Sequence, residues 1–153
     1  MIDLKTIVVP VDFSAHSETA FQMALELARR FRSELYLLHV HQLPAYVYPD
    51  GIFPLTPEIM AEIEQKIAIE LGRLAERVRA AEVRCVQKSV LGVTFVEIVR
   101  FARETEADLI VMGTHGRSGL SHALLGSVTE KVLRKAPCPV LAVRPESHTF
   151  VHP

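Results

Sequence analysis

Three glycines in the last third of the chain are spaced for phosphate binding. Gly113 and Gly116 enclose a Gly-x-x-Gly loop directly after an apolar run, and Gly126-Ser127 follows after nine further residues. Because glycine lacks Cβ and adopts positive φ freely, such a loop can turn its amide N–H groups toward an anion. A helix beginning near Ser127 would add unsatisfied N–H groups and the positive end of its dipole. The spacing predicts that two backbone segments converge on one phosphate.

The common nucleotide-binding motifs are missing from the sequence. Neither the Walker A string Gly-x4-Gly-Lys-Ser/Thr nor the dinucleotide fingerprint Gly-x-Gly-x-x-Gly occurs in the 153 residues. A P-loop ATPase or a Rossmann dehydrogenase is therefore disfavoured. Turn or cap geometry would account for any one of the three glycines, but it explains their joint spacing poorly.

Short apolar runs alternate with helical periods along the chain. The expected strands are 6–11, 35–40, 83–90, 109–112 and 140–143, and the expected helices are 14–32, 56–80, 93–104 and 127–136. Ser14 is a good N-cap, and Thr56-Pro57 combines a capping residue with Pro at the first helical position. The predicted buried helix faces are Phe21, Leu25, Ala28 and Phe31 in the first helix and Ile59, Ile63, Ile67, Leu71, Leu74 and Val78 in the second.

This alternation predicts an α/β fold with right-handed crossovers and a doubly wound parallel sheet. Ligands of such sheets bind beyond the carboxyl ends of the strands, where the strand order reverses. The segment His41 to Leu55 has neither period and is rich in Pro and aromatic residues. We expect it to be a long connection that acts as a lid, a contact surface or a mobile excursion.

Composition indicates one globular domain. The chain is 49% hydrophobic and 23% charged, with a formal net charge of −1, so bulk electrostatics favour neither nucleic acid nor an anionic membrane. The opening residues MIDLKTIVVPVDF carry Asp3 and Lys5 within the apolar run and do not resemble a signal peptide. We therefore expect a cytoplasmic protein whose two cysteines, Cys85 and Cys138, are reduced.

Several motifs in one order resemble the universal stress protein family, specifically its ATP-binding branch. They are IVVPVDFSAHS, ADLIVMG, Gly113-x2-Gly116-x9-Gly126-Ser127 and APCPVLAVRP, and together they span nearly the whole chain. The resemblance implies a single five-stranded parallel sheet of strand order 3-2-1-4-5, of the adenine nucleotide α-hydrolase-like (Rossmann-like) kind. We expect residues 1–145 to form this domain and residues 146–153 to form a C-terminal tail.

The resemblance also implies a binding site for ATP with magnesium, with AMP or ADP as alternatives. Asp12, just past the first strand, would contact ribose hydroxyls or a magnesium ion bound to phosphate; the alternative is a helix cap or a loop aspartate without a ligand. The implied nucleotide-binding residues are Pro10, Val11, Asp12, Val40, Met112, Gly113, Thr114, His115, Gly116, Arg117, Gly126, Ser127 and Val128.

Other roles compete for some of these residues. Ser127 and Glu130 form Ser-x-x-Glu, which predicts a capping box at the start of the last helix. His39, His41 and His115 invite a zinc hypothesis, but no Cys or carboxylate completes a recognisable ligand spacing, so zinc is disfavoured. His115 as a catalytic base is likewise less plausible than a solvent-exposed loop histidine.

The resulting interpretation is a nucleotide-dependent stress-response or signalling module rather than an efficient enzyme, because there is no P-loop lysine or recognised water-positioning residue. A slow ATP hydrolase is one alternative. A dimeric interaction module that binds no nucleotide is another, although this chain keeps the glycines. The resemblance implies dimerisation by pairing of the last strand, which is common in the family, so we expect a homodimer formed by Val140, Leu141 and Val143.

Overall fold

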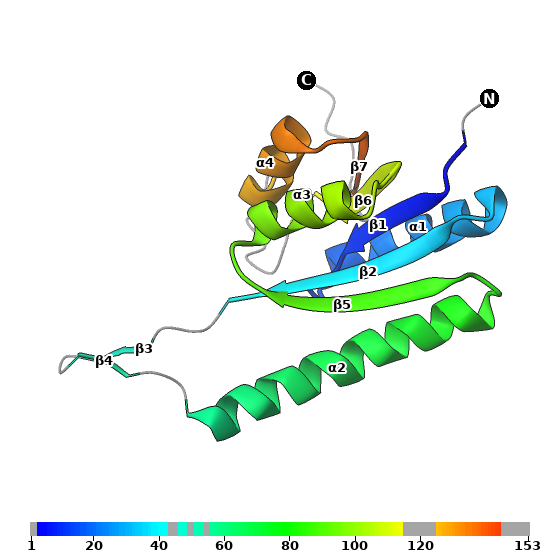
Figure 1. Cartoon of the computed structure of the whole chain (residues 1–153). Helices are drawn as coiled ribbons and strands as arrows, with labels where there is room; N and C mark the ends of the chain where they lie inside the picture. Colours follow the sequence, from blue (N-terminus) through cyan, green and yellow to red (C-terminus); the bar gives the residue numbers. More distant parts are fainter. Residues whose placement is uncertain (1–2, 43–45, 49–50, 54–55, 115–124, 145–153) are drawn as a thin grey trace.

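Five parallel strands form the central sheet of the computed structural model, which describes residues 3–42, 46–48, 51–53, 56–114 and 125–144 (Figure 1). The strands are β1 (Thr6–Pro10), β2 (Glu34–His41), β5 (Cys85–Leu91), β6 (Leu109–Gly113) and β7 (Val140–Val143). Their order across the sheet is β5-β2-β1-β6-β7, with every pair parallel. Counted along the chain this is 3-2-1-4-5, so the predicted topology is confirmed.

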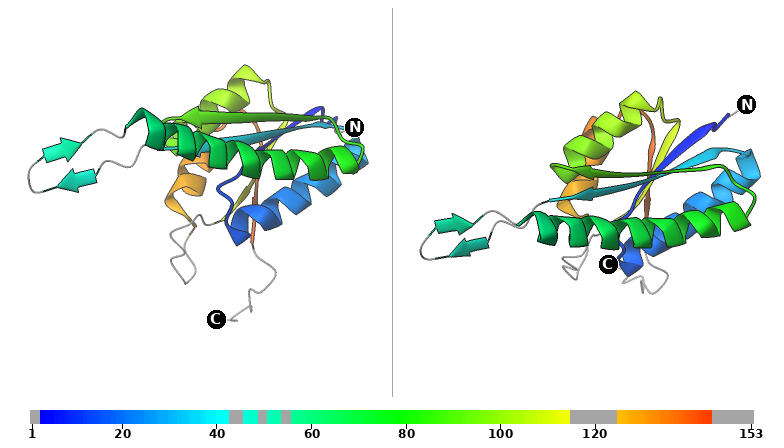
Figure 2. Two further views of the ribbon diagram at one scale, coloured as in Figure 1. Left: turned by 90° about the horizontal axis from the view of Figure 1, so that it is seen from below. Right: turned by 60° about the horizontal axis from the view of Figure 1, so that its bottom comes forward.

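Four helices cover the two faces of the sheet (Figure 2). Helices α1 (Ala15–Phe31) and α2 (Pro57–Ala80) pack on one face, and α3 (Thr94–Glu104) and α4 (Ser127–Lys135) pack on the other. The predicted caps of the first two helices are confirmed, since the Ser14 hydroxyl accepts from the Ser17 N–H and the Thr56 hydroxyl accepts from the Ile59 N–H.

The central strand β1 is buried on both faces, which explains its unbroken apolar run. Ile7 and Val9 belong to the core under α1 and α2, whereas Val8 belongs to the core under α3 and α4, and all three are 0% exposed. Successive strand residues point to opposite faces, so a strand covered by helices on both sides needs apolar residues at every position.

Strand β1 hydrogen-bonds to β2 over a longer stretch than to β6. Five residue pairs, Thr6↔Glu34 to Pro10↔Leu38, join β1 to β2, but only Ile7↔Leu109 and Val8↔Ile110 join β1 to β6. The Val11 N–H donates to Leu38 O at 2.9 Å, and the Asp108 N–H donates to Thr6 O at 2.9 Å. Odd-numbered residues of β1 therefore face β2 and even-numbered ones face β6. Pro10 faces β6 and has no N–H to donate, so the ladder between these strands cannot continue there.

The connection between β2 and α2 contains regular structure that the sequence did not indicate. It contains an antiparallel hairpin of β3 (Tyr46–Tyr48) and β4 (Gly51–Phe53), which extends away from the sheet (Figure 1). The sequence did not indicate this hairpin, because strands of three residues are too short to show an alternating pattern. The role of the connection as a lid, a contact surface or a mobile excursion stays a prediction. The rest of the connection, 43–45, 49–50 and 54–55, lies outside the described residues.

Of the predicted helix faces, Leu25, Ile63 and Leu74 are half-buried, and two further members are exposed. Phe31 is 40% exposed and Ile59 is 44% exposed. Phe31 is the last residue of α1, and Ile59 lies in the first turn of α2, so both project past the part of the helix that contacts the sheet. The two cysteines are free thiols, as expected, and burial raises the pKa of both. No helix among the described residues is long and apolar enough to span a bilayer.

Glu18 and Arg77 connect α1 to α2. The Arg77 guanidinium donates to both carboxylate oxygens of Glu18, at 2.9 and 2.6 Å, and lies 4.6 Å from the centroid of the Phe21 ring. The hydrogen bonds from Arg77 lower the pKa of Glu18, and those same bonds raise the pKa of Arg77. This ion pair fixes the spacing of the two helices on one side of the sheet.

We expect Glu18→Gln to lower the free energy of unfolding at pH 7 by at most about 1 kcal/mol, because the pair is partly exposed. The folded-state pKa of Glu18 lies below its ordinary value of 4.5, so the ionised form stabilises the fold above that value. The contribution is lost as the pH falls through the folded-state pKa. Urea unfolding at neutral and acidic pH should show a deficit that shrinks in acid. Glu26→Gln, which removes a pair within α1 alone, is the control; equal deficits for both variants would contradict this account.

Candidate functional site

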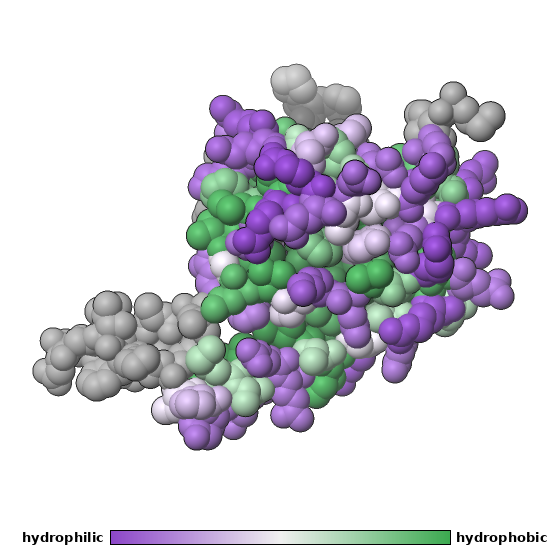
Figure 3. Space-filling model, viewed as in Figure 1, coloured by the Kyte–Doolittle hydropathy of each residue, from purple (hydrophilic) through white to green (hydrophobic). Residues whose placement is uncertain are grey.

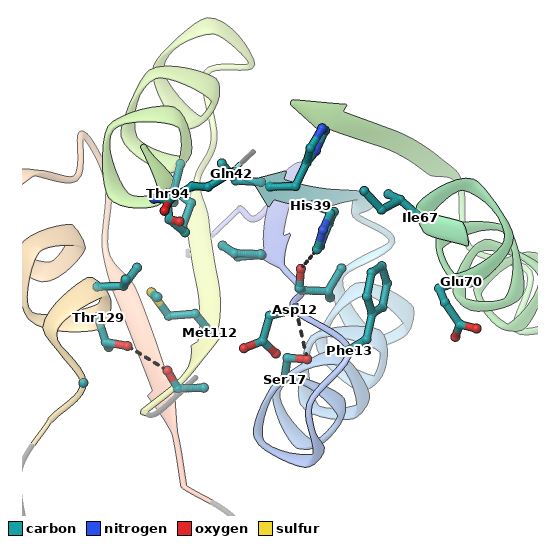
Figure 4. Close-up of a pocket in the computed structure, with 18 of the residues that line it drawn as sticks. Asp12, Phe13, Ser17, His39, Gln42, Ile67, Glu70, Thr94, Met112 and Thr129 are labelled. Atoms are coloured by element: carbon teal, nitrogen blue, oxygen red, sulfur yellow. Dashed lines mark hydrogen bonds between the residues drawn. The ribbon is translucent and has the colours of Figure 1, made fainter. Parts of the chain in front are cut away.

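A cavity of about 880 Å³ lies beyond the carboxyl ends of β1, β2 and β6 (Figure 4). It is of the size that binds small molecules and cofactors. Of the predicted nucleotide-binding residues, those that line it are Pro10, Val11, Asp12, Val40, Met112, Gly113, Gly126, Ser127 and Val128. Thr114 is buried beside them, and His115, Gly116 and Arg117 lie outside the described residues.

Asp12 lies in the turn between β1 and α1 and lines the cavity. Asp12 Oδ1 accepts from the Ser14 N–H at 3.0 Å and from the Ser14 hydroxyl at 2.5 Å. The Asp12 N–H donates to Ser17 Oγ at 3.3 Å. Ser14 is the N-cap of α1, so the helix-cap alternative for Asp12 is wrong. One carboxylate oxygen of Asp12 orders the turn while the carboxylate also lines the cavity, and its contact with a nucleotide stays a prediction.

Hydrogen bonds bring the start of α4 against the end of β6. The Gly126 N–H donates to Thr114 O at 2.8 Å, and the Thr114 N–H donates to Val143 O at 3.0 Å. The buried Thr129 hydroxyl donates to Gly113 O at 2.9 Å (Figure 4). Gly113 and Gly126, which are far apart in the sequence, thus meet at one wall of the cavity. Their convergence on a phosphate stays a prediction, and Gly116 lies outside the described residues.

The predicted capping box at α4 is wrong. The N-cap residue is Gly126, Ser127 is the first helical residue, and no side chain of the N-cap bonds to the first turn. The Glu130 N–H donates to Gly126 O at 2.9 Å, which is an ordinary helical hydrogen bond. A capping box would require Ser127 as the N-cap, but the N-cap lies one residue earlier, at Gly126. Glycine at the N-cap supplies no acceptor oxygen, so the first-turn amides of α4 gain no side-chain cap from it.

Several cavity residues were missed in the sequence analysis. Phe13, Ser17, Thr94 and Thr129 line the cavity, and His39 and His41, considered only as zinc ligands, also line it. Helix α2 adds Ile63, Lys66, Ile67 and Glu70. Two of these had been placed in the core by their spacing. The apolar period of 56–80 indicated a helix that packs on the sheet. It could not show which residues of that helix reach the cavity, because this depends on how the helix docks against the sheet.

The two histidines of β2, His39 and His41, lie side by side on the cavity wall. Their rings lie 6.0 Å apart at an angle of 8°, and His41 Nδ1 lies 3.2 Å from Ser89 Oγ. Among the described residues, no group of three or more His, Cys, Asp or Glu side chains is placed to hold a metal ion. The charged side chains that line the described cavity are Asp12, Lys66 and Glu70. The Asp12 carboxylate and the first residues of α4 therefore line the same cavity.

A parallel sheet with a cavity at its switch point defines a doubly wound α/β protein, a class in which ligands generally bind at the carboxyl ends of the strands. Comparison with known proteins narrows this class, because the universal stress protein family model matches residues 3–144. A universal stress protein of Methanocaldococcus jannaschii is 38% identical over 142 residues, which cover 92% of this chain and 82% of the relative. The chain belongs to the universal stress protein family.

Solved structures of this family have the same fold. UspA from Lactobacillus plantarum matches with a TM-score of 0.78 and 28% identity, covering 94% of this chain and 100% of that one. A universal stress protein in complex with cAMP matches with a TM-score of 0.70 and 26% identity, over 95% and 100% of the two chains. One from Archaeoglobus fulgidus in complex with dAMP matches with a TM-score of 0.61 and 26% identity, over 93% and 98%.

Thr129→Val tests the attachment of α4 to β6. The substitution keeps the volume but leaves Gly113 O without the buried hydroxyl, and we expect it to lower the free energy of unfolding by about 1–3 kcal/mol. Thr105→Val is the control, because Phe101 O, the acceptor of the Thr105 hydroxyl, also accepts the Thr105 N–H. Denaturant unfolding measures both, and a loss for Thr105→Val as large as that for Thr129→Val would contradict the assignment.

Proposed function

We propose that this chain binds an adenine nucleotide, ATP with magnesium, in the cavity and acts as a nucleotide-dependent stress-response or signalling module. The observation that carries this proposal is the meeting of the Asp12 turn and the start of α4 at the gap between β1 and β6. One segment offers a carboxylate, and the other offers backbone N–H groups with the positive end of a helix dipole. A nucleotide presents hydroxyls and phosphates to such a pair of walls.

Each predicted residue has a role in this proposal. The amides of Gly113, Ser127 and Val128 would hold phosphate oxygens, and Gly126, whose own N–H donates to Thr114 O, would let phosphate approach closely because it has no side chain. Asp12 would accept from ribose hydroxyls or help to hold the magnesium ion. Pro10, Val11, Val40 and Met112 would give the apolar edge and backbone groups for the base. The amides of His115, Gly116 and Arg117 would add further donors, and Thr114, whose own N–H donates to Val143 O, would hold the start of this segment beside the cavity.

The related complexes support the chemical class of the ligand. One relative is described with cAMP and another with dAMP, and both molecules combine adenine with a phosphate group. The choice of ATP over AMP or ADP rests on the glycine pattern of this chain. Two glycine-containing segments can offer amides to more than one phosphate group, which suits the longer phosphate chain of ATP. We propose that the bound nucleotide acts by changing conformation or assembly, because a ligand that prefers one state shifts the population toward it.

Titration calorimetry with ATP and magnesium, on protein stripped of nucleotide, tests this proposal. The parent should bind, and Gly126→Val should weaken binding by at least about tenfold, since its side chain would crowd the amides that hold phosphate. Gly72→Val is the matched control, because Gly72 lies on α2 with open space around it and does not line the cavity. No binding by the parent, or equal loss in both variants, would refute the proposed site.

We propose further that two copies associate through β7. Both edges of the sheet carry an exposed apolar residue, Leu141 on β7 and Val86 on β5, each 38% exposed. The edge strand β5 also carries exposed Gln87 and Lys88. The face of the molecule that includes β5 shows hydrophobic and hydrophilic patches intermixed (Figure 3). Charged residues on an edge strand oppose pairing with another chain, whereas β7, Val-Leu-Ala-Val, has none.

Leu141→Lys should therefore weaken the dimer by placing a charge on the pairing edge. Light scattering over a concentration series should show the parent as a dimer and the variant shifted toward monomer. Val86→Lys makes a comparable change on the opposite edge at the same exposure and should leave the dimer intact. An unchanged dimer in Leu141→Lys, or dissociation by Val86→Lys alone, would sink this proposal.

A further inference from the structure

The imidazole of His39 contacts the residues on both sides of Asp12. His39 lies on β2, is 6% exposed, and reaches across to the turn that follows β1 (Figure 4). Its Nδ1 lies 2.8 Å from Val11 O, and its ring stacks on Phe13 with centroids 4.6 Å apart and an angle of 23°. One side chain thus touches the residue before and the residue after the carboxylate.

The contact with Val11 determines which imidazole nitrogen carries a proton. A carbonyl oxygen only accepts, so Nδ1 must be the donor in this hydrogen bond. The Val11 N–H donates to Leu38 O in the same strand as His39. Strand β2 therefore holds both the N–H and the carbonyl of Val11, which places the peptide bond leading into Asp12.

The contact with Phe13 stabilises an unfavourable backbone conformation. Phe13 has φ of 63°, in the left-handed region that bulky residues rarely adopt. Such conformations cost about 1–3 kcal/mol and persist only where surrounding contacts hold them. Packing of the phenyl ring on His39 is one such contact, and the left-handed residue is what turns the chain from β1 into α1.

We propose that His39 is a positioning residue that sets the place of the Asp12 carboxylate through Val11 and Phe13. Ser14 and Ser17 hold Asp12 from the helix side, at the distances given above, and His39 holds its two neighbours from the sheet side. The inference rests on the proposed function, because it assigns His39 to the ligand only through Asp12. Its role is distinct from the metal-binding role that its spacing to His41 had suggested.

A double-mutant cycle on ATP affinity, measured by calorimetry with magnesium, tests this inference. Asp12→Ala should weaken binding by roughly 10- to 100-fold, as expected for a hydrogen bond to a charged group. His39→Leu should weaken it by about tenfold in the parent, but by less than about twofold when Asp12 is already alanine. His39→Asn keeps an N–H donor near the place of Nδ1 and should recover part of the loss.

His41→Leu is the matched control, since it changes the same residue type on the same strand and the same cavity wall, and the described contacts of His41 are with Ser89 and the His39 ring rather than with the turn. Its effect should add to that of Asp12→Ala. Additive behaviour of His39→Leu as well would overturn the inference while leaving nucleotide binding standing. Failure of the parent to bind ATP would instead refute the proposed function and this inference together.

A second variant covers the case in which His39→Leu does not fold, as judged by circular dichroism and thermal unfolding. Phe13→Leu removes the aromatic contact from a half-buried position and keeps an apolar side chain there. It should also weaken ATP binding several-fold in the parent and lose that effect beside Asp12→Ala. Independent effects of Phe13 and Asp12 would contradict the coupling that the geometry requires.

Discussion

The site depends on the early end of the hydrogen-bond ladder between β1 and β6. Both strands continue past their last pair, Val8↔Ile110, but Pro10 faces β6 without an N–H to donate. On the other side, β1 stays paired with β2 as far as Pro10, and Val11 adds one more bond. The two central strands are therefore free to separate at their carboxyl ends, which leaves room between them for a ligand.

Three further constraints shape that opening. The Thr129 hydroxyl and the Gly126 N–H attach the start of α4 to the end of β6. The left-handed Phe13 redirects the chain into α1, and His39 packs against that turn. The ion pair of Glu18 and Arg77 then holds α2 beside α1, so that its apolar face closes the far wall. Each wall comes from a different crossover, which is why no continuous motif describes the site.

The sequence predicted the strand order through the family resemblance and predicted much of the cavity lining, because apolar runs, caps and glycines are local signals. It could not predict the roles of His39, Phe13 or Thr129. Their contacts depend on strand register, on one backbone angle and on how a helix is docked, and none of these is local in the sequence. The capping box failed for a related reason: α4 begins one residue after its N-cap at Gly126, so the Ser-x-x-Glu spacing falls one position out of register. The β3–β4 hairpin was missed because its strands are so short.

The most direct test of nucleotide binding at this gap is a backbone amide NMR titration with ATP and magnesium. The account predicts that the largest shifts fall on the amides of Gly126, Ser127 and Val128 at the start of α4 and of Asp12 after β1. Amides near the last turn of α1, at the opposite end of the sheet, should remain in place. Shifts concentrated at that opposite end, with the α4 amides unmoved, would contradict the account.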